Sequence, residues 1–129
     1  MSPEYNMTEL LKYRNQEFTF APVGTSIDGA DTKYYPSEGG INAGPFKEGD
    51  FFIKCTAFAG TSLDGTPEVQ DPVSGDWFEH TASFFTQLTD VGSERKPLTS
   101  NLCRNLRMKV VTVGAGVKTF SIGAILKIM

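Results

Sequence analysis

Two segments near the C-terminus alternate apolar and polar side chains, which is the pattern of a β-strand with one buried face. They cover residues 106–113 and 117–128 and are separated by the tripeptide Gly-Ala-Gly. If Ala115 is the tip of a hairpin, Val110 lies opposite Phe120, and the apolar residues of both strands share one face. A slip of one residue would lose that match. The pattern therefore predicts an antiparallel hairpin at the end of the chain.

Turn residues predict two tight reversals. Gly114 and Gly116 flank the hairpin tip and supply the positive φ angles that a tight loop needs. Upstream, residues 71–76 read Asp-Pro-Val-Ser-Gly-Asp, which is typical of a hairpin loop built on a type I turn. Such a loop brings Val69 close to Phe78.

A further strand is predicted over residues 51–59, where Phe52 and Lys54 belong to a mixed face. In the strand that leads into residues 71–76, Gly65 and Pro67 indicate an edge position or a bulge, since proline cannot donate a hydrogen bond to a ladder. The predicted apolar face of residues 51–59 consists of Phe51, Ile53, Cys55, Ala57 and Ala59.

The first part of the chain lacks such alternation. Residues 22–49 are rich in glycine and proline and are interpreted as an ordered arm or a long loop. We therefore expect residues 1–48 to form an N-terminal arm that packs on the sandwich or on a partner, and residues 49–129 to form the folded domain. Short strands separated by turns predict an all-β protein, an antiparallel β-sandwich of Ig-like or jelly-roll-like type.

Charge is segregated along the chain. Residues 1–94 hold five Lys or Arg and 15 Asp or Glu, whereas residues 95–129 hold seven Lys or Arg and no acid, giving the net charge of −3. Either the basic part is neutralised by acidic loops within the fold, or it is an exposed basic strip that faces an acidic partner. A pI near 5.1 disfavours nucleic acid as that partner. No apolar run approaches the length of a membrane span, so we expect no membrane partner.

Few residues offer chemistry. Cys55 and Cys103 lie 48 positions apart without zinc-site spacing, so we interpret them as reduced, buried apolar residues, or as a single bridge if their strands are neighbours. His80 is the only histidine, and a thiol pair with a cysteine would need the fold to bring them together. Asp-Gly pairs are typical of turns rather than of calcium loops. We expect no enzyme, no cofactor and no metal site.

Part of this sequence resembles a known family. The segment GTSLDGTPEVQDPVSGDWF, followed after a loop by LRMKVVTVGAGVKTFSIGAIL, resembles the small β-sandwich virion proteins of tailed bacteriophages, of the head decoration or cement type. The resemblance rests on a Val-Gln pair before the Asp-Pro-Val-Ser-Gly turn, the aromatic pair after it, and a closing hairpin with a Gly-rich tip. It covers residues 51–129 and leaves residues 1–50 without a counterpart.

The resemblance implies a non-enzymatic structural protein made in the host bacterial cytoplasm and assembled into a virion, at the capsid surface. We expect a decoration protein that binds the major capsid protein, as a trimer or another small homo-oligomer. The predicted partner-binding residues are the arm residues Tyr34, Tyr35, Pro36 and Phe46 and the basic residues Lys109, Lys118 and Lys127. The arm residues have an alternative role, which is to pack over the open end of the sandwich itself.

The main rival function is a tail or fibre component that binds a host-surface glycan. Trp77, Tyr34 and Tyr35 would then act as stacking platforms. If Trp77 has no such role, we interpret it as an anchor in the core.

Overall fold

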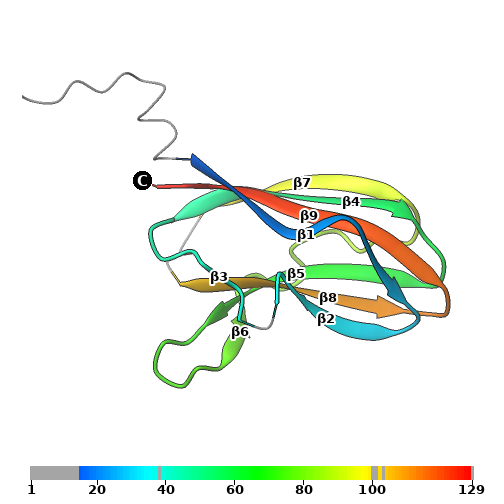
Figure 1. Ribbon diagram of the computed structural model, residues 1–129, viewed down its shortest axis with the longest axis horizontal. Helices are drawn as coiled ribbons and strands as arrows, with labels where there is room; N and C mark the ends of the chain where they lie inside the picture. Colours follow the sequence, from blue (N-terminus) through cyan, green and yellow to red (C-terminus); the bar gives the residue numbers. More distant parts are fainter. Residues whose placement is uncertain (1–14, 38, 100–101, 103, 129) are drawn as a thin grey trace, which may run out of the picture.

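The computed structural model describes residues 15–37, 39–99, 102 and 104–128, which form two antiparallel sheets packed face to face (Figure 1). This confirms the predicted all-β sandwich. No helix able to cross a membrane occurs in these residues. The first sheet, here called the β9 sheet, has the order β1 (Asn15–Asp28), β9 (Val117–Lys127), β4 (Glu48–Ala57) and β7 (Gly92–Leu98). The second, the β8 sheet, has the order β2 (Asp31–Tyr35), β8 (Asn105–Val113), β5 (Ser62–Gln70) and β6 (Trp77–Glu79), with β3 (Ile41–Asn42) also paired to β8.

The core lies between the sheets and is built from alternate residues of each strand. Phe51, Ile53 and Cys55 of β4 are buried, as their alternation predicts. Ala57 and Ala59 are exposed instead, because the register with β9 shifts between Cys55 and Ala57. The predicted apolar face of this segment is therefore correct only as far as Cys55.

The predicted C-terminal hairpin is wrong in its pairing. Within the described residues β8 pairs with β2, β3 and β5, whereas β9 pairs with β1 and β4, so the two strands belong to different sheets. Val110 and Phe120 are both buried in the core, so the predicted apolar faces are correct. The faces meet across the sandwich and not along one sheet, and residues 114–116 form an arch between the layers (Figure 1).

The glycines of this arch have the expected positive φ angles, 90° at Gly114 and 109° at Gly116. They also allow close approach to the segment that follows β4. A Cβ at Gly116 would lie 2.5 Å from Cβ of Ala59, and one at Gly114 would lie 2.5 Å from the amide nitrogen of Thr61. The requirement for glycine is therefore steric as well as conformational.

The expectation of a loop-like N-terminal arm is also wrong. β1 runs along β9, and β2 and β3 run along the outer edge of β8, so these segments belong to the same sandwich as the rest of the chain. Register shifts on both sides of Ala21 accommodate the Pro-Val-Gly sequence that obscures β1 in the pattern. Residue 48 does not separate an arm from a sandwich; residues 1–14 lie outside the described residues.

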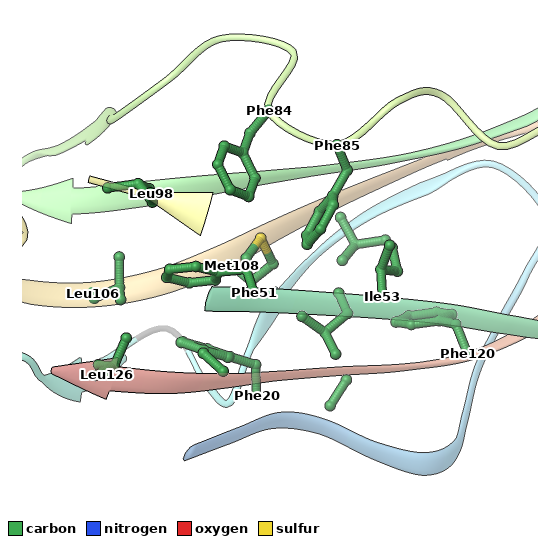
Figure 2. Close-up of a cluster of buried hydrophobic side chains, with 14 of the residues drawn as sticks. Phe20, Phe51, Ile53, Phe84, Phe85, Leu98, Leu106, Met108, Phe120 and Leu126 are labelled. Atoms are coloured by element: carbon green, nitrogen blue, oxygen red, sulfur yellow. The ribbon is translucent and has the colours of Figure 1, made fainter. Parts of the chain in front are cut away.

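The β6–β7 loop closes one side of the core. β6 pairs only with residues 68–70 of β5, and the loop covers the remaining edge through an isolated bridge between Leu63 and Leu88. Phe84 and Phe85 point from this loop into the hydrophobic cluster (Figure 2), where the Phe84 ring lies 5.6 Å from that of Phe51. The edge position expected around Gly65 and Pro67 is thus confirmed.

Candidate interaction surface

The outer face of the β8 sheet carries aromatic and charged side chains. Because Met108 faces the core, its neighbours Arg107 and Lys109 face outward, and so do their cross-strand partners. Tyr34 is the partner of Lys109 on β2, and Glu68 is the partner of Arg107 on β5. The sequence-predicted residues Tyr34 and Lys109 are thus brought together on this face.

Arg107 is held between two aromatic rings. Its guanidinium carbon lies 3.8 Å from the ring centroid of Tyr34 and 4.3 Å from that of Trp77. Its Nε donates a hydrogen bond to Oε1 of Glu68 at 2.8 Å, and the two side chains are only 11% and 8% exposed. We call Tyr34, Glu68, Trp77 and Arg107 the aromatic clamp. A paired charge covered by two rings fixes the position of both rings.

Trp77 connects two distant parts of the sheet. It belongs to β6, yet its Cη2 would lie 2.9 Å from a Cβ at Gly40, in the loop between β2 and β3. The side chain is partly buried on the outer face, so it is neither a core anchor nor a fully exposed platform. Glu79, two residues further along β6, lies 3.9 Å from Nζ of Lys109.

The β5–β6 hairpin confirms the prediction from the turn sequence. Val69 is the register partner of Phe78, and residues 71–76 form the loop. The Asp71 carboxylate accepts hydrogen bonds from the amide of Val73 at 2.9 Å and from Oγ of Ser74 at 2.8 Å, and these bonds lower the pKa of Asp71. The loop is therefore internally braced. Figure 1 shows the hairpin extending beyond the body of the sandwich.

A polar pocket of about 260 Å³ on the outer face of the β8 sheet is lined in part by Lys109, the register partner of Tyr34. Gln87 Nε2 donates to Oδ2 of Asp64 at its edge. The pocket thus offers carboxylate, hydroxyl and ammonium groups to a polar ligand. Its lining includes Asp64, Thr66, Glu79, Ser83 and Lys109.

The outer face of the β9 sheet carries a more apolar groove of about 370 Å³. Phe52 and Thr19 are both register partners of Gly123, and the glycine leaves a gap between their side chains. Val23, on the irregular part of β1, is 87% exposed at the groove, and Phe52 is 37% exposed. We call this feature the β9-sheet groove; it is lined by Thr19, Pro22, Val23, Phe52, Lys54, Ser121 and Gly123, among others.

Two of the predicted partner-binding aromatics belong to the core. Phe46 is 3% exposed and lies edge-on to Phe18, with 5.5 Å between ring centroids. Tyr35 is partly buried edge-on against Phe120, and burial raises its pKa. Their prediction as partner anchors is wrong, and the alternative, packing on the sandwich itself, holds for both. Pro36 is exposed.

The predicted basic strip is not continuous. Lys118 is fully buried, and its Nζ lies 2.9 Å from the carbonyl oxygen of Gly114, with further carbonyl contacts. Lys109 lies on the β8 sheet and Lys127 on the β9 sheet, both partly exposed. Basic residues of the C-terminal part instead form ion pairs with acids from earlier in the chain, which favours neutralisation within the fold: Arg95–Asp50, Arg107–Glu68 and Lys109–Glu79.

The side chains that could be chemically reactive are those of the cysteines and of His80. Cys55 is a buried free thiol that donates to the carbonyl of Ala57, and burial raises its pKa. Cys103 lies outside the described residues. Nδ1 of His80 lies 2.9 Å from Oγ1 of Thr81. Among the residues that the structure describes, no group of three or more His, Cys, Asp or Glu is arranged to hold a metal ion.

The sequence analysis missed the centre of the aromatic clamp. In the sequence, Arg107 occupies an outward-facing strand position, where a basic residue is normally expected to be exposed to solvent. Glu68 becomes its partner only through the β5–β8 register. No local signal distinguishes this pair from ordinary surface charges. The sequence analysis had identified only the two aromatic members of the clamp, Tyr34 and Trp77.

Comparison with known proteins places the chain by its fold. No known family and no curated protein matches its sequence. Among solved structures, a chain from the structure of the infectious bursal disease virus Gx strain matches with a TM-score of 0.55 and 17% identity. The match covers 89% of this chain and 33% of the viral chain. The PRD1 vertex protein matches with a TM-score of 0.50 and 14% identity, over 90% and 97% of the two chains.

A third match comes from a different kind of protein. The CBM22-1–GH10 modules of a Clostridium thermocellum xylanase, complexed with xylohexaose, match with a TM-score of 0.55 and 8% identity, over 88% of this chain and 25% of that one. The likeness is one of fold. This chain spans about a third of the viral chain and a quarter of the xylanase chain.

Proposed function

We propose that this protein is a non-enzymatic structural component of a virion, a decoration protein that binds the shell formed by a major capsid protein. The observation that carries the proposal is the aromatic clamp. Tyr, Trp and Arg are the residue types that contribute most to protein–protein binding, and here they stand fixed on the outer face of one sheet. The sandwich fold shared with the viral structures supports the proposal.

The geometry favours binding because the side chains of the aromatic clamp are already ordered before a partner binds. The ion pair with Glu68 and the contact with Gly40 already hold Arg107 and Trp77 in place. Binding therefore loses less side-chain entropy than it would with free rings. A protein that binds only the assembled shell stabilises that shell by mass action, and repeated sites on a lattice add avidity.

The test is co-sedimentation of the purified protein with empty shells assembled from a major capsid protein of the same virus. Tyr34→Ala and Trp77→Ala should each weaken binding about tenfold or more, as expected for hot-spot residues. Val91→Ala is the matched control, because Val91 is 54% exposed outside the clamp and should leave binding unchanged.

Circular dichroism and thermal melting would establish that each variant is folded. The proposal fails if the wild-type protein does not sediment with shells. It fails equally if a folded Trp77→Ala variant and a folded Tyr34→Ala variant both bind as well as the control.

A second candidate function is glycan binding, as in a tail or fibre component. The polar pocket lined by Glu79 and Lys109, with its carboxylate and hydroxyl groups, lies on the same outer face of the β8 sheet as Trp77 and favours it. Aromatic faces next to such groups are suited to sugar rings. Binding to a glycan array that is lost in Trp77→Ala, without any binding to shells, would replace the decoration proposal with this one.

A further inference from the structure

The β9-sheet groove is an apolar surface with a basic edge. Its gap exists because Gly123 separates Phe52 from Thr19, and Val23 stands exposed beside it. Lys54 also lines the groove, and among the described residues it has no ion-pair partner. A ligand for this groove would combine a small apolar group with negative charge.

The tip of the β5–β6 hairpin has that chemistry. Val73 is 93% exposed at the apex, next to Pro72, and the loop begins with Asp71 and ends with Asp76. Gln70 adds a hydrogen bond from its Nε2 to the carbonyl of Gly75 at 3.0 Å. A braced loop that exposes an apolar apex between two carboxylates is already in a shape that a partner can bind.

The tip and the groove of one molecule cannot meet. The hairpin belongs to the β8 sheet, whereas the groove lies on the outer face of the β9 sheet, on the other side of the core (Figure 1). Any contact between them joins two molecules. The patches differ, so the contact is head-to-tail and leaves one free tip and one free groove for further copies.

We propose that the β5–β6 tip of one copy docks in the β9-sheet groove of a second copy, with Val73 against Phe52 and Val23 and with Asp76 facing Lys54. This contact joins copies of the chain into a homo-oligomer. It does not depend on shell binding, although copies joined in this way would present several aromatic clamps to a shell.

The first measurement is sedimentation velocity of the full chain over a range of concentrations. The wild-type protein should associate as its concentration rises. Val73→Asp should weaken association about tenfold or more, because it places a charge in an apolar contact. Val91→Asp is the matched control and should associate like the wild type. A wild-type protein that is monomeric throughout, or a folded Val73→Asp variant that associates normally, would overturn the proposal.

A charge exchange tests the pairing itself. Lys54→Glu and Asp76→Lys should each weaken self-association, because each places like charges in contact. Mixing the two variants should restore association. The acidic groove of the Lys54→Glu variant then meets the basic tip of the Asp76→Lys variant, and the unaltered groove of the second meets the unaltered tip of the first. Asp76 suits this test because only its backbone braces the loop. If the mixture associates no better than the single variants, the pairing is wrong.

The self-association experiments and the shell-binding experiment test the two proposals independently. Shell binding by a protein that never self-associates would leave the decoration proposal standing and remove this one. Self-association without shell binding would do the reverse.

Discussion

At the scale of single residues, Lys118 links two turns of the fold through its buried side chain. It faces inward from β9, fully buried, and its Nζ contacts the carbonyl oxygens of Gly114 at 2.9 Å, Gly116 at 3.3 Å and Gly29 at 3.4 Å. Gly29 also donates its amide to Gly116 at 3.0 Å. The ammonium group therefore ties the β8–β9 arch to the turn between β1 and β2, and the oxygens replace the water it has lost.

Replacing this ammonium group should destabilise the protein. Lys118→Met keeps the length of the side chain but removes the donor to the carbonyl of Gly114, whereas the carbonyls of Gly29 and Gly116 keep hydrogen bonds from Thr112 and from the Gly29 amide. We therefore expect a loss of about 1–3 kcal/mol in the free energy of unfolding. Urea unfolding monitored by Trp77 fluorescence would measure it. Lys127→Met, at a partly exposed position of the same strand, is the control and should change stability by less than about 0.5 kcal/mol. Equal stability of the two variants would contradict this role.

The sequence contains a signal for this burial. Lys118 lies two residues before Phe120 and four before Ile122, on the face that alternation assigns to the core. Its charge led to the prediction of an exposed strip, because a buried lysine is rare without a partner. The partners are backbone carbonyls of two turns, which no pattern of side chains reveals.

At the scale of elements, β8 and β9 show what the alternation of apolar and polar residues can predict and what it cannot. Alternation depends on the local backbone and correctly identifies which residues are buried. It does not identify the neighbouring strand, because two successive strands can bury their apolar faces side by side in one sheet or opposite each other in two. The hairpin of residues 71–76 was predicted correctly because Asp71 and Gly75 determine that turn locally.

The arch between the sheets should be intolerant of side chains. Gly116→Ala combines a φ of 109° with a Cβ placed 2.5 Å from Cβ of Ala59, so we expect it to cost more than about 2 kcal/mol of unfolding free energy. Gly24→Ala is the control, because Gly24 has a similar φ of 93° but nothing within 4 Å of the added Cβ. It should lose only the conformational part, about 1 kcal/mol. Equal losses in thermal or urea unfolding would show that the contact with Ala59 is unimportant.

At the scale of the whole molecule, the loop between β6 and β7 joins the two sheets at an open side of the sandwich. It provides Phe84 and Phe85 to the core, and it is held to β7 by polar contacts. Thr86 donates to Glu94 through its amide at 2.9 Å and through Oγ1 at 2.6 Å, and Nζ of Lys96 donates to the carbonyl of Phe84 at 2.6 Å. Charged residues of an edge strand thus position the aromatic side chains that complete the core.

This arrangement predicts an acid-sensitive loop. The hydrogen bonds from Thr86 lower the pKa of Glu94 below its ordinary value of 4.5. A group with a lowered pKa in the folded state stabilises that state above its ordinary pKa, and the stabilisation disappears as the pH falls through the lowered value. Because the contacts are exposed to solvent, we expect a contribution of less than about 1 kcal/mol at pH 7. Glu94→Gln should remove it at neutral pH.

Amide hydrogen exchange of Leu88, whose amide donates to the carbonyl of Leu63 at 2.9 Å, provides a local measurement of that contribution. At pH 7 the Leu88 amide should exchange faster in Glu94→Gln than in the wild type, because the loop opens more often. Well below the lowered pKa the two proteins should exchange at the same rate, since the carboxylate is then protonated in the wild type as well. Glu17→Gln, at an exposed position of β1, should match the wild type at both pH values. A difference between Glu94→Gln and the wild type that persists unchanged in acid would mean that the charge of Glu94 is not what holds the loop.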